Sequence, residues 1–237
     1  LNQFMYRSLE TDFNKKFREI QDMIDRTKVK NEYYFYSLHE QLIDKRTFYE
    51  TRPLPGKRKP FYDDLSAEID HFTLFFVTKM LIYYTLMINR GAVLKYDFEY
   101  RMYEPIINFI EENNFDKYPL IKSYYLTLKL NKEDGSEKIY FELKKYLIKN
   151  ADLIEAEDKK LIFTELSNYA LKKAYKEKPE FKKERFDLMN LQLKQKTYPD
   201  ENEGWMDLGF FQNYVIESAE AGKLDLTGKF LEEYSLK

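Results

Sequence analysis

The chain has few residues that could perform catalysis: two histidines, His39 and His71, and no cysteine. Without cysteine there can be no thiol nucleophile, thiolate metal ligand or disulfide. His39-Glu40 could open a metalloprotease His-Glu-x-x-His helix, but Ile43 stands where the second histidine would be. The glycine motifs of phosphate-binding loops and of α/β-hydrolases do not occur either. We therefore predict no metal, no cofactor and no catalytic residue, and a protein that is not an enzyme.

His71, Thr78 and Thr85 recur every seven residues inside the most apolar run of the chain. On a helix this spacing gives one narrow polar stripe. The stripe could bind a ligand, or lie in a helical active site near His71. We favour a seam whose polar groups are satisfied by neighbouring helices, because buried polar groups usually find hydrogen-bond partners.

The densest basic stretch lies at 172–185 and alternates with Tyr175, Phe181 and Phe186. Its candidate nucleic-acid contacts are Lys172, Lys173, Lys176, Lys182, Lys183 and Arg185. Basic groups contact phosphates and aromatic rings stack on bases, so single-stranded nucleic-acid binding is the alternative function. Three glutamates interrupt the stretch, and the two phenylalanines fit the buried face of a helix. We therefore rank this function second.

Composition favours helices packed in thin layers. The 237 residues are 34% charged with a net charge of −2, so no global field attracts nucleic acid or an anionic membrane. Seven glycines and seven prolines are too few for a turn-rich β-sandwich or barrel. The 21 tyrosines suit half-buried positions, because the ring can be covered while the hydroxyl stays in water.

Two amphipathic helices, over 2–26 and 31–50, are predicted from apolar residues three and four positions apart. Their short link makes residues 1–51 an N-terminal helical hairpin. The segment 52–60 holds three prolines and a glycine, which exclude regular helix. We interpret it as an extended, solvated linker, in preference to a polyproline ligand or a phosphate-contacting loop.

The apolar run Leu65–Arg90 is predicted to be the central helix of the protein, paired with a partner inside residues 61–114. A bilayer span is the alternative, but Lys79 near the middle would cost several kcal/mol in hydrocarbon. Acidic residues precede the run and Arg90-Gly91 follows it, as in a soluble helix. We therefore predict no membrane insertion and a helix end at Gly91.

Residues 93–114 are ambiguous. Tyr96, Phe98 and Tyr100 alternate with polar residues at the period of a strand. No partner strand is predicted anywhere in the chain, and Pro105 suits the first turn of a helix. We interpret 93–114 as helical, with a break near Glu104.

Helix pairs recur through residues 117–237. They are predicted at 119–131, 136–150, 157–176, 182–196, 205–221 and 224–237. Helix pairs repeating every 20–50 residues are typical of a solenoid, in which no pair buries its apolar face alone. The predicted fold is all-α: stacked antiparallel helical hairpins in an α-solenoid or an irregular helical array, forming one continuous helical domain.

Trp205-Met206-Asp207-Leu208-Gly209 matches the Trp-x-x-Leu-Gly opening of a tetratricopeptide repeat. Residues 117–237 thus resemble a degenerate tetratricopeptide-like (TPR-like) array, although the earlier pairs lack the tryptophan and small residues of the signature. The resemblance implies binding of a protein or peptide in a concave groove.

These patterns predict a non-enzymatic helical-repeat scaffold that mediates protein–protein interaction, with another protein or peptide as its partner. A cytoplasmic location is expected, because the N-terminal residues are charged and amphipathic rather than apolar. The chain begins at Leu1, so a removed signal peptide and a longer native protein stay open as alternatives. Partner identity, pathway and oligomeric state are not encoded in any pattern found.

Overall fold

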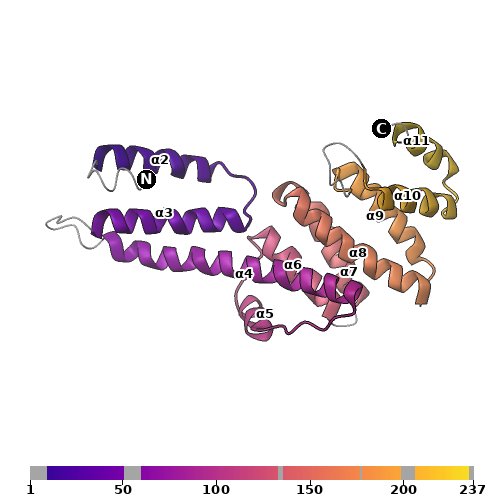
Figure 1. Ribbon diagram of the computed structural model, residues 1–237, viewed down its shortest axis with the longest axis horizontal. Coiled ribbons are helices and arrows are strands. Elements are labelled where there is room, and N and C mark those ends of the chain that lie inside the picture. The colour runs from indigo at the N-terminus through magenta and orange to yellow at the C-terminus, as the bar shows by residue number, and fades with distance from the viewer. Residues whose placement is uncertain (1–9, 51–59, 133–135, 177, 199–205, 235–237) are drawn as a thin grey trace. The chain divides into compact units, whose positions relative to one another are not determined.

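The computed structural model describes residues 10–50, 60–132, 136–176, 178–198 and 206–234, and this part of the chain is all-helical (Figure 1). Ten α-helices and one 3-10 turn occupy it, with no strand, which confirms the predicted all-α class. Contacts divide the chain into two units. Unit 1 holds Leu1–Arg90 and Tyr96–Lys122, and unit 2 holds Gly91–Lys95 and Ser123–Lys237.

Unit 1 combines the predicted N-terminal hairpin with most of the region predicted as the central helix and its partner. Its helices are α2 (Glu10–Asp25), α3 (Glu32–Glu50), α4 (Pro60–Leu94) and α5 (Tyr103–Glu112). In Figure 1, α3 lies between α2 and α4. Phe13 and Phe48 stack at 3.7 Å between ring centroids in the α2–α3 contact, and both are fully buried. Except for Pro60, which begins α4, the predicted linker 52–60 lies outside the described residues.

Ion pairs join α3 to α4. Arg46 donates to both carboxylate oxygens of Glu68, at 2.9 and 3.1 Å, and Lys45 lies 2.7 Å from Asp64. Lys79, which argued against a bilayer span, pairs with Glu32 at 3.0 Å. The polar residues of the apolar run thus fix it against α3.

α4 differs from the predicted central helix in two respects. It continues through Gly91 to Leu94, since one glycine inside a helix costs only about 1 kcal/mol and does not force an end. It also keeps large apolar side chains exposed, among them Ile69 at 58% and Tyr83 at 53%. Among the described residues it is the one helix long and apolar enough to cross a membrane, a test that the core helix of a soluble protein also passes.

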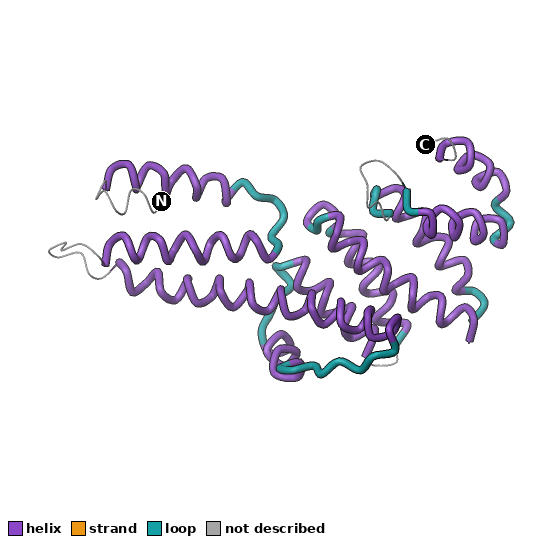
Figure 2. The backbone as a smooth tube through the Cα atoms, viewed as in Figure 1, coloured by secondary structure: helices purple, strands orange, loops and turns teal. Residues whose placement is uncertain are grey.

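The prediction of a helix over 93–114 is wrong for residues 95–102, which form a loop between α4 and α5 (Figure 2). Lys95 and Met102 take positive φ angles of 51° and 58° at its two ends, which breaks the helix on both sides. Between them residues 96–100 have no regular structure, and the Tyr103 N–H donates to the Tyr100 carbonyl in a turn before α5. The Tyr84 hydroxyl donates to the Arg101 carbonyl at 2.6 Å and holds the loop to α4.

α6 (Pro119–Lys132) begins in unit 1 and continues into unit 2. The other unit 2 elements are α7 (Glu137–Lys149), the 3-10 turn Ala151–Leu153, α8 (Ala156–Lys176), α9 (Phe181–Gln195), α10 (Leu208–Glu220) and α11 (Leu224–Tyr234). α7 packs on α8, α8 on α9, α9 on α10, and α10 on α11, so consecutive helices are neighbours. The helices lie close to their predicted positions, but α10 begins at Leu208 because Asp207 caps it.

The most completely covered helix is α6 rather than α4. Its buried residues are Leu120, Ile121, Ser123, Tyr124, Tyr125, Leu126, Thr127, Leu128 and Leu130. α6 is therefore more completely buried than the apolar run that was predicted to form the central helix.

Candidate functional site

A cleft of about 230 Å³ lies between α8, α9 and α10 in unit 2. α9 contacts both α8 and α10, and Figure 1 shows it between them. The cleft therefore depends on the packing of three helices, each of which contributes part of the lining.

The mouth of the cleft is built at the start of α10. Asp207 caps the helix by accepting a hydrogen bond from the Phe210 N–H at 2.9 Å. A Cβ added at Gly209 would lie 3.0 Å from the same carboxylate oxygen, so a larger residue there would have to displace the cap. Asp207 and Gly209 come from the Trp-x-x-Leu-Gly motif, and its Trp205 lies outside the described residues.

The floor of the cleft is apolar. Met189 of α9 and Phe210 of α10 line it, and each is 7% exposed. Both belong to a buried cluster with Phe186, Tyr214 and Phe230, in which the last two rings lie 4.0 Å apart. This cluster fixes α9, α10 and α11 against one another and makes the floor rigid.

The central polar residue of the cleft is Gln192. The residue is only 5% exposed, but its amide keeps access to the solvent in the cleft. Ser167 and Asn213 line the same cleft from α8 and α10. Thr164 also lines it, and its hydroxyl donates to the Lys160 carbonyl at 2.9 Å. Three uncharged polar side chains from three helices therefore face one cleft.

One ion pair borders the cleft. The Arg185 guanidinium contacts the Glu217 carboxylate, and their side chains are 15% and 9% exposed. Burial raises the pKa of Glu217, and the charge of Arg185 opposes that rise. The positive charge of Arg185 and the negative charge of Glu217 therefore balance at the border of the cleft.

The cleft suits a neutral, amide-containing ligand. Primary amides such as Gln192 and Asn213 offer both donors and acceptors, as the carbonyl and N–H of a peptide group require. The volume is below the roughly 300–1,000 Å³ of typical small-molecule sites. It fits a short length of polypeptide better than a nucleotide or a cofactor.

The titratable residues that line the cleft are Arg185 and Asp207, and no histidine or lysine lines it. The Asp207 carboxylate accepts the Phe210 N–H and is the carboxylate in the lining. Within the described residues, no group of three or more histidine, aspartate and glutamate side chains could hold a metal ion.

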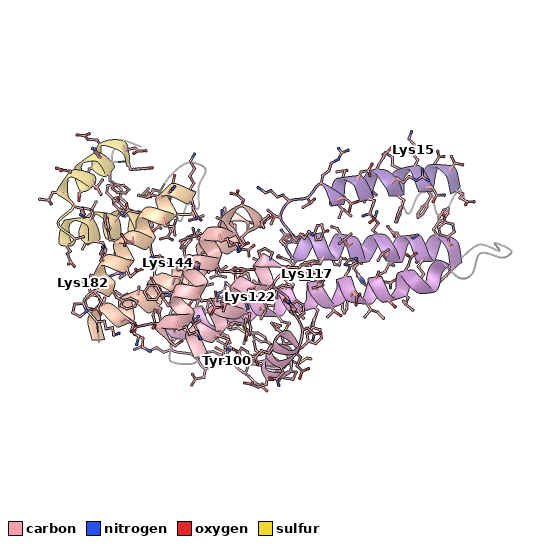
Figure 3. All side chains as sticks on the ribbon, turned by 180° about the vertical axis from the view of Figure 1, so that it is seen from behind. Lys15, Tyr100, Lys117, Lys122, Lys144 and Lys182 are labelled. Atoms are coloured by element: carbon pink, nitrogen blue, oxygen red, sulfur yellow. The ribbon has the colours of Figure 1, made fainter. Side chains whose placement is uncertain are left out.

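Residues of the basic stretch have different acidic partners in the structure. Lys178 pairs with Glu137 at 2.7 Å, and Lys182, labelled in Figure 3, pairs with Glu220 at 3.5 Å. Arg185 faces the cleft and Glu217.

Among the other predicted nucleic-acid contacts, Lys173 lies over the Tyr169 ring at 5.8 Å from its centroid. Lys172 and Lys183 are exposed. The Lys176 side chain lies outside the described residues. Phe181 and Phe186 are 3% and 4% exposed, so neither ring is available to stack on a base.

In the stripe of His71, Thr78 and Thr85, both threonine hydroxyls bond within α4. The Thr78 hydroxyl donates to the Leu74 carbonyl at 2.6 Å, and that of Thr85 to the Leu81 carbonyl at 3.0 Å. Both threonines are fully buried and are satisfied by their own helix rather than by the neighbouring helices we expected. His71 is half-buried, and its Nδ1 lacks a hydrogen-bond partner among the described residues.

Comparison with protein-family models, with curated proteins and with solved structures finds no match to this chain. Its function must therefore be argued from its own geometry.

No sequence pattern predicted the cleft. Gln192, Ser167 and Asn213 are separated along the chain and lie on three helices, so no spacing brings them together. The one available signal was Asp207 followed by Leu-Gly, which marked a helix start but not the cleft beside it.

Proposed function

We propose that this protein is a non-enzymatic helical-repeat scaffold that binds another protein, and that the cleft between α8, α9 and α10 receives a short extended segment of that partner. The observation that carries the proposal is the meeting of three uncharged polar side chains, Ser167, Gln192 and Asn213, from three helices around one cleft. A peptide group placed there could donate to and accept from these side chains.

The packing order of unit 2 supports a repeated helix-pair unit. The pairs α8–α9 and α10–α11 follow one another, and α9 contacts the first helix of the next pair. Binding clefts between repeated helices are common in stacked helical arrays, because each added pair extends one continuous surface. A TPR-like arrangement of residues 117–237 is part of the proposal.

A library of short random peptides displayed on phage tests the proposal against the full chain. Enriched sequences would be synthesised with blocked termini and titrated by calorimetry. We expect Gln192→Leu and Asn213→Ala each to weaken binding by about two- to tenfold, as for the loss of one neutral hydrogen bond.

Gln212→Ala is the matched control, because Gln212 neighbours Asn213 on α10 but is exposed and does not line the cleft. It should leave the affinity unchanged. Methylation of a peptide main-chain nitrogen should abolish binding at one position and not at others. If no peptide is enriched, or if Gln192→Leu binds as well as the parent, the proposed site is wrong.

A further inference from the structure

A second surface, in unit 1, has the properties of a docking site. Large apolar side chains remain exposed along one side of α3 and α4, with exposed fractions from 40% to 64%. We call this surface the α3–α4 strip and define it by Tyr33, Tyr36, Leu65, Ile69, Phe72 and Tyr83.

Ring contacts make the strip continuous. Tyr36 contacts Phe75 at 5.2 Å between centroids, and Phe72 contacts the His39 ring at 5.1 Å. The Lys79 ammonium lies over the ring of Tyr33 at 5.1 Å and near that of Tyr83 at 6.0 Å. These contacts cross from α3 to α4, so both helices line one surface.

The strip has the length and periodicity of a helix. Leu65, Ile69, Phe72 and Tyr83 follow one face of α4, and at 1.5 Å per residue they extend over about 27 Å. This is about five helical turns. A helix laid along the strip could place an apolar residue against each exposed side chain.

The rim of the strip is acidic. Glu40 on α3 and Asp70 on α4 are exposed, and neither has an ion-pair partner among the described residues. One turn from Glu40, burial raises the pKa of Asp44, and the negative charge of Glu40 adds to the rise. The cation within the strip, Lys79, is already paired with Glu32 at 3.0 Å.

The rim charge selects among possible occupants. A second copy of the chain would bring the acidic residues of both rims together, and like charges across an interface oppose association. An anionic lipid surface would be repelled for the same reason. A helix with an apolar face flanked by lysine or arginine would gain both burial and charge complementarity.

We propose that the α3–α4 strip docks a basic amphipathic helix of a partner protein. This site is separate from the cleft between α8, α9 and α10 and does not depend on it. The two proposals can therefore fail independently.

The test uses two dye-labelled synthetic peptides of about 20 residues, the length of about five turns. Both carry leucines on one face at the spacing of the strip residues on α4. One has lysines beside the leucines, and the other has glutamates at the same positions. Anisotropy titrations with the full chain should show the lysine peptide binding at least about tenfold more tightly, with an affinity that falls as salt is added.

Variants locate the binding. Ile69→Ser and Phe72→Ser should each weaken the lysine peptide by about tenfold, as expected of central apolar contacts. Glu40→Gln and Asp70→Asn should weaken it less and flatten the salt dependence. Ile148→Ser on α7 is the matched control, because Ile148 is 46% exposed but lies in unit 2. Gln192→Leu should also leave binding of the lysine peptide unchanged.

Three results would overturn the proposal. Equal binding of the two peptides would show that the rim charge does not select the partner. A concentration-dependent dimer that Ile69→Ser abolishes, seen by light scattering, would assign the strip to a second copy. Sedimentation with phosphatidylserine vesicles, lost in the same variant, would assign it to a membrane surface.

Discussion

Buried polar residues in this chain fall into two groups. Thr78, Thr85 and Thr127 are fully buried, and each donates its hydroxyl to the carbonyl four residues earlier in its own helix. Such bonds cost the helix little and need no neighbour. Gln192 is different, because its side chain lines the cleft between three helices. At the scale of single residues, this contrast separates structural polar groups from a candidate binding group.

We expect Gln192→Leu to leave stability almost unchanged even as it weakens peptide binding. The amide has access to solvent in the cleft, so its replacement should change the free energy of unfolding by no more than about 0.5 kcal/mol. Urea unfolding followed by circular dichroism measures it.

Gln41→Leu is the comparison, because Gln41 is 3% exposed and its Nε2 donates to the Phe17 carbonyl at 3.2 Å, while its Oε1 is buried without a partner among the described residues. The variant loses one hydrogen bond and removes one buried oxygen without a partner, and these opposing effects should change stability by no more than about 1 kcal/mol. A larger loss would show that Oε1 has a partner within the fold.

His71 should make the protein less stable in mild acid. Burial lowers the pKa of His71 below its ordinary value of 6.5, and Asp70 partly opposes the shift. As the pH falls through 6.5 the unfolded chain binds a proton that the folded chain does not, so stability declines until the folded pKa is passed.

His71→Asn should flatten this decline when melting temperatures are compared between about pH 7 and about pH 5. An unchanged slope would mean that other groups cause it.

At the scale of helices, length and apolarity do not determine which helix is buried. α4 is the longest helix and contains the most apolar run, but it is open along the α3–α4 strip. α6 is shorter and more polar in sequence, and it is almost wholly covered. A helix is buried by what surrounds it, which its own sequence does not state.

A pair of leucine substitutions tests this difference. Leu128→Ala in α6 removes a fully buried side chain and should cost about 2–5 kcal/mol. Leu65→Ala in α4 removes one that is 40% exposed and should cost about 0.5 kcal/mol. Urea midpoints of the two variants give the two losses of stability. Equal losses would contradict the greater burial of α6.

Helix positions were predictable because the apolar periodicity of a surface helix is a local property. The loop at 95–102 was not predictable. Its alternating residues resemble a strand, and its two positive φ angles occur at Lys95 and Met102, residue types that do not favour them.

The candidate sites could not be predicted from local sequence patterns. The cleft needs three helices in contact, and the basic stretch looked like one surface until Lys178, Lys182 and Arg185 were found with separate acidic partners.

At the scale of the molecule, the charges nearly balance in sum, and in unit 2 basic residues pair with acidic ones. The net charge is −2, and ion pairs in unit 2 link α7 to α9 and α9 to α10. We therefore expect no salt-dependent binding when the full chain is titrated with single-stranded RNA or DNA at low ionic strength. Tight binding that weakens steeply with salt would restore the nucleic-acid alternative.

The contact between Phe35 and Tyr118 has a consequence for synthesis of the chain. Their rings meet edge to face at 5.3 Å, and Tyr118 lies just before α6, at the end of the sequence that unit 1 uses. While the ribosome makes the chain, α2, α3 and α4 emerge well before Tyr118. Until Tyr118 emerges, Phe35 lacks this ring contact, and the apolar side of α4 lacks the later residues that it packs against. Contacts between residues so far apart form late. Nascent chains stalled before residue 118 should therefore be cut by protease within α2–α4, and protection should appear once the tyrosine has left the exit tunnel.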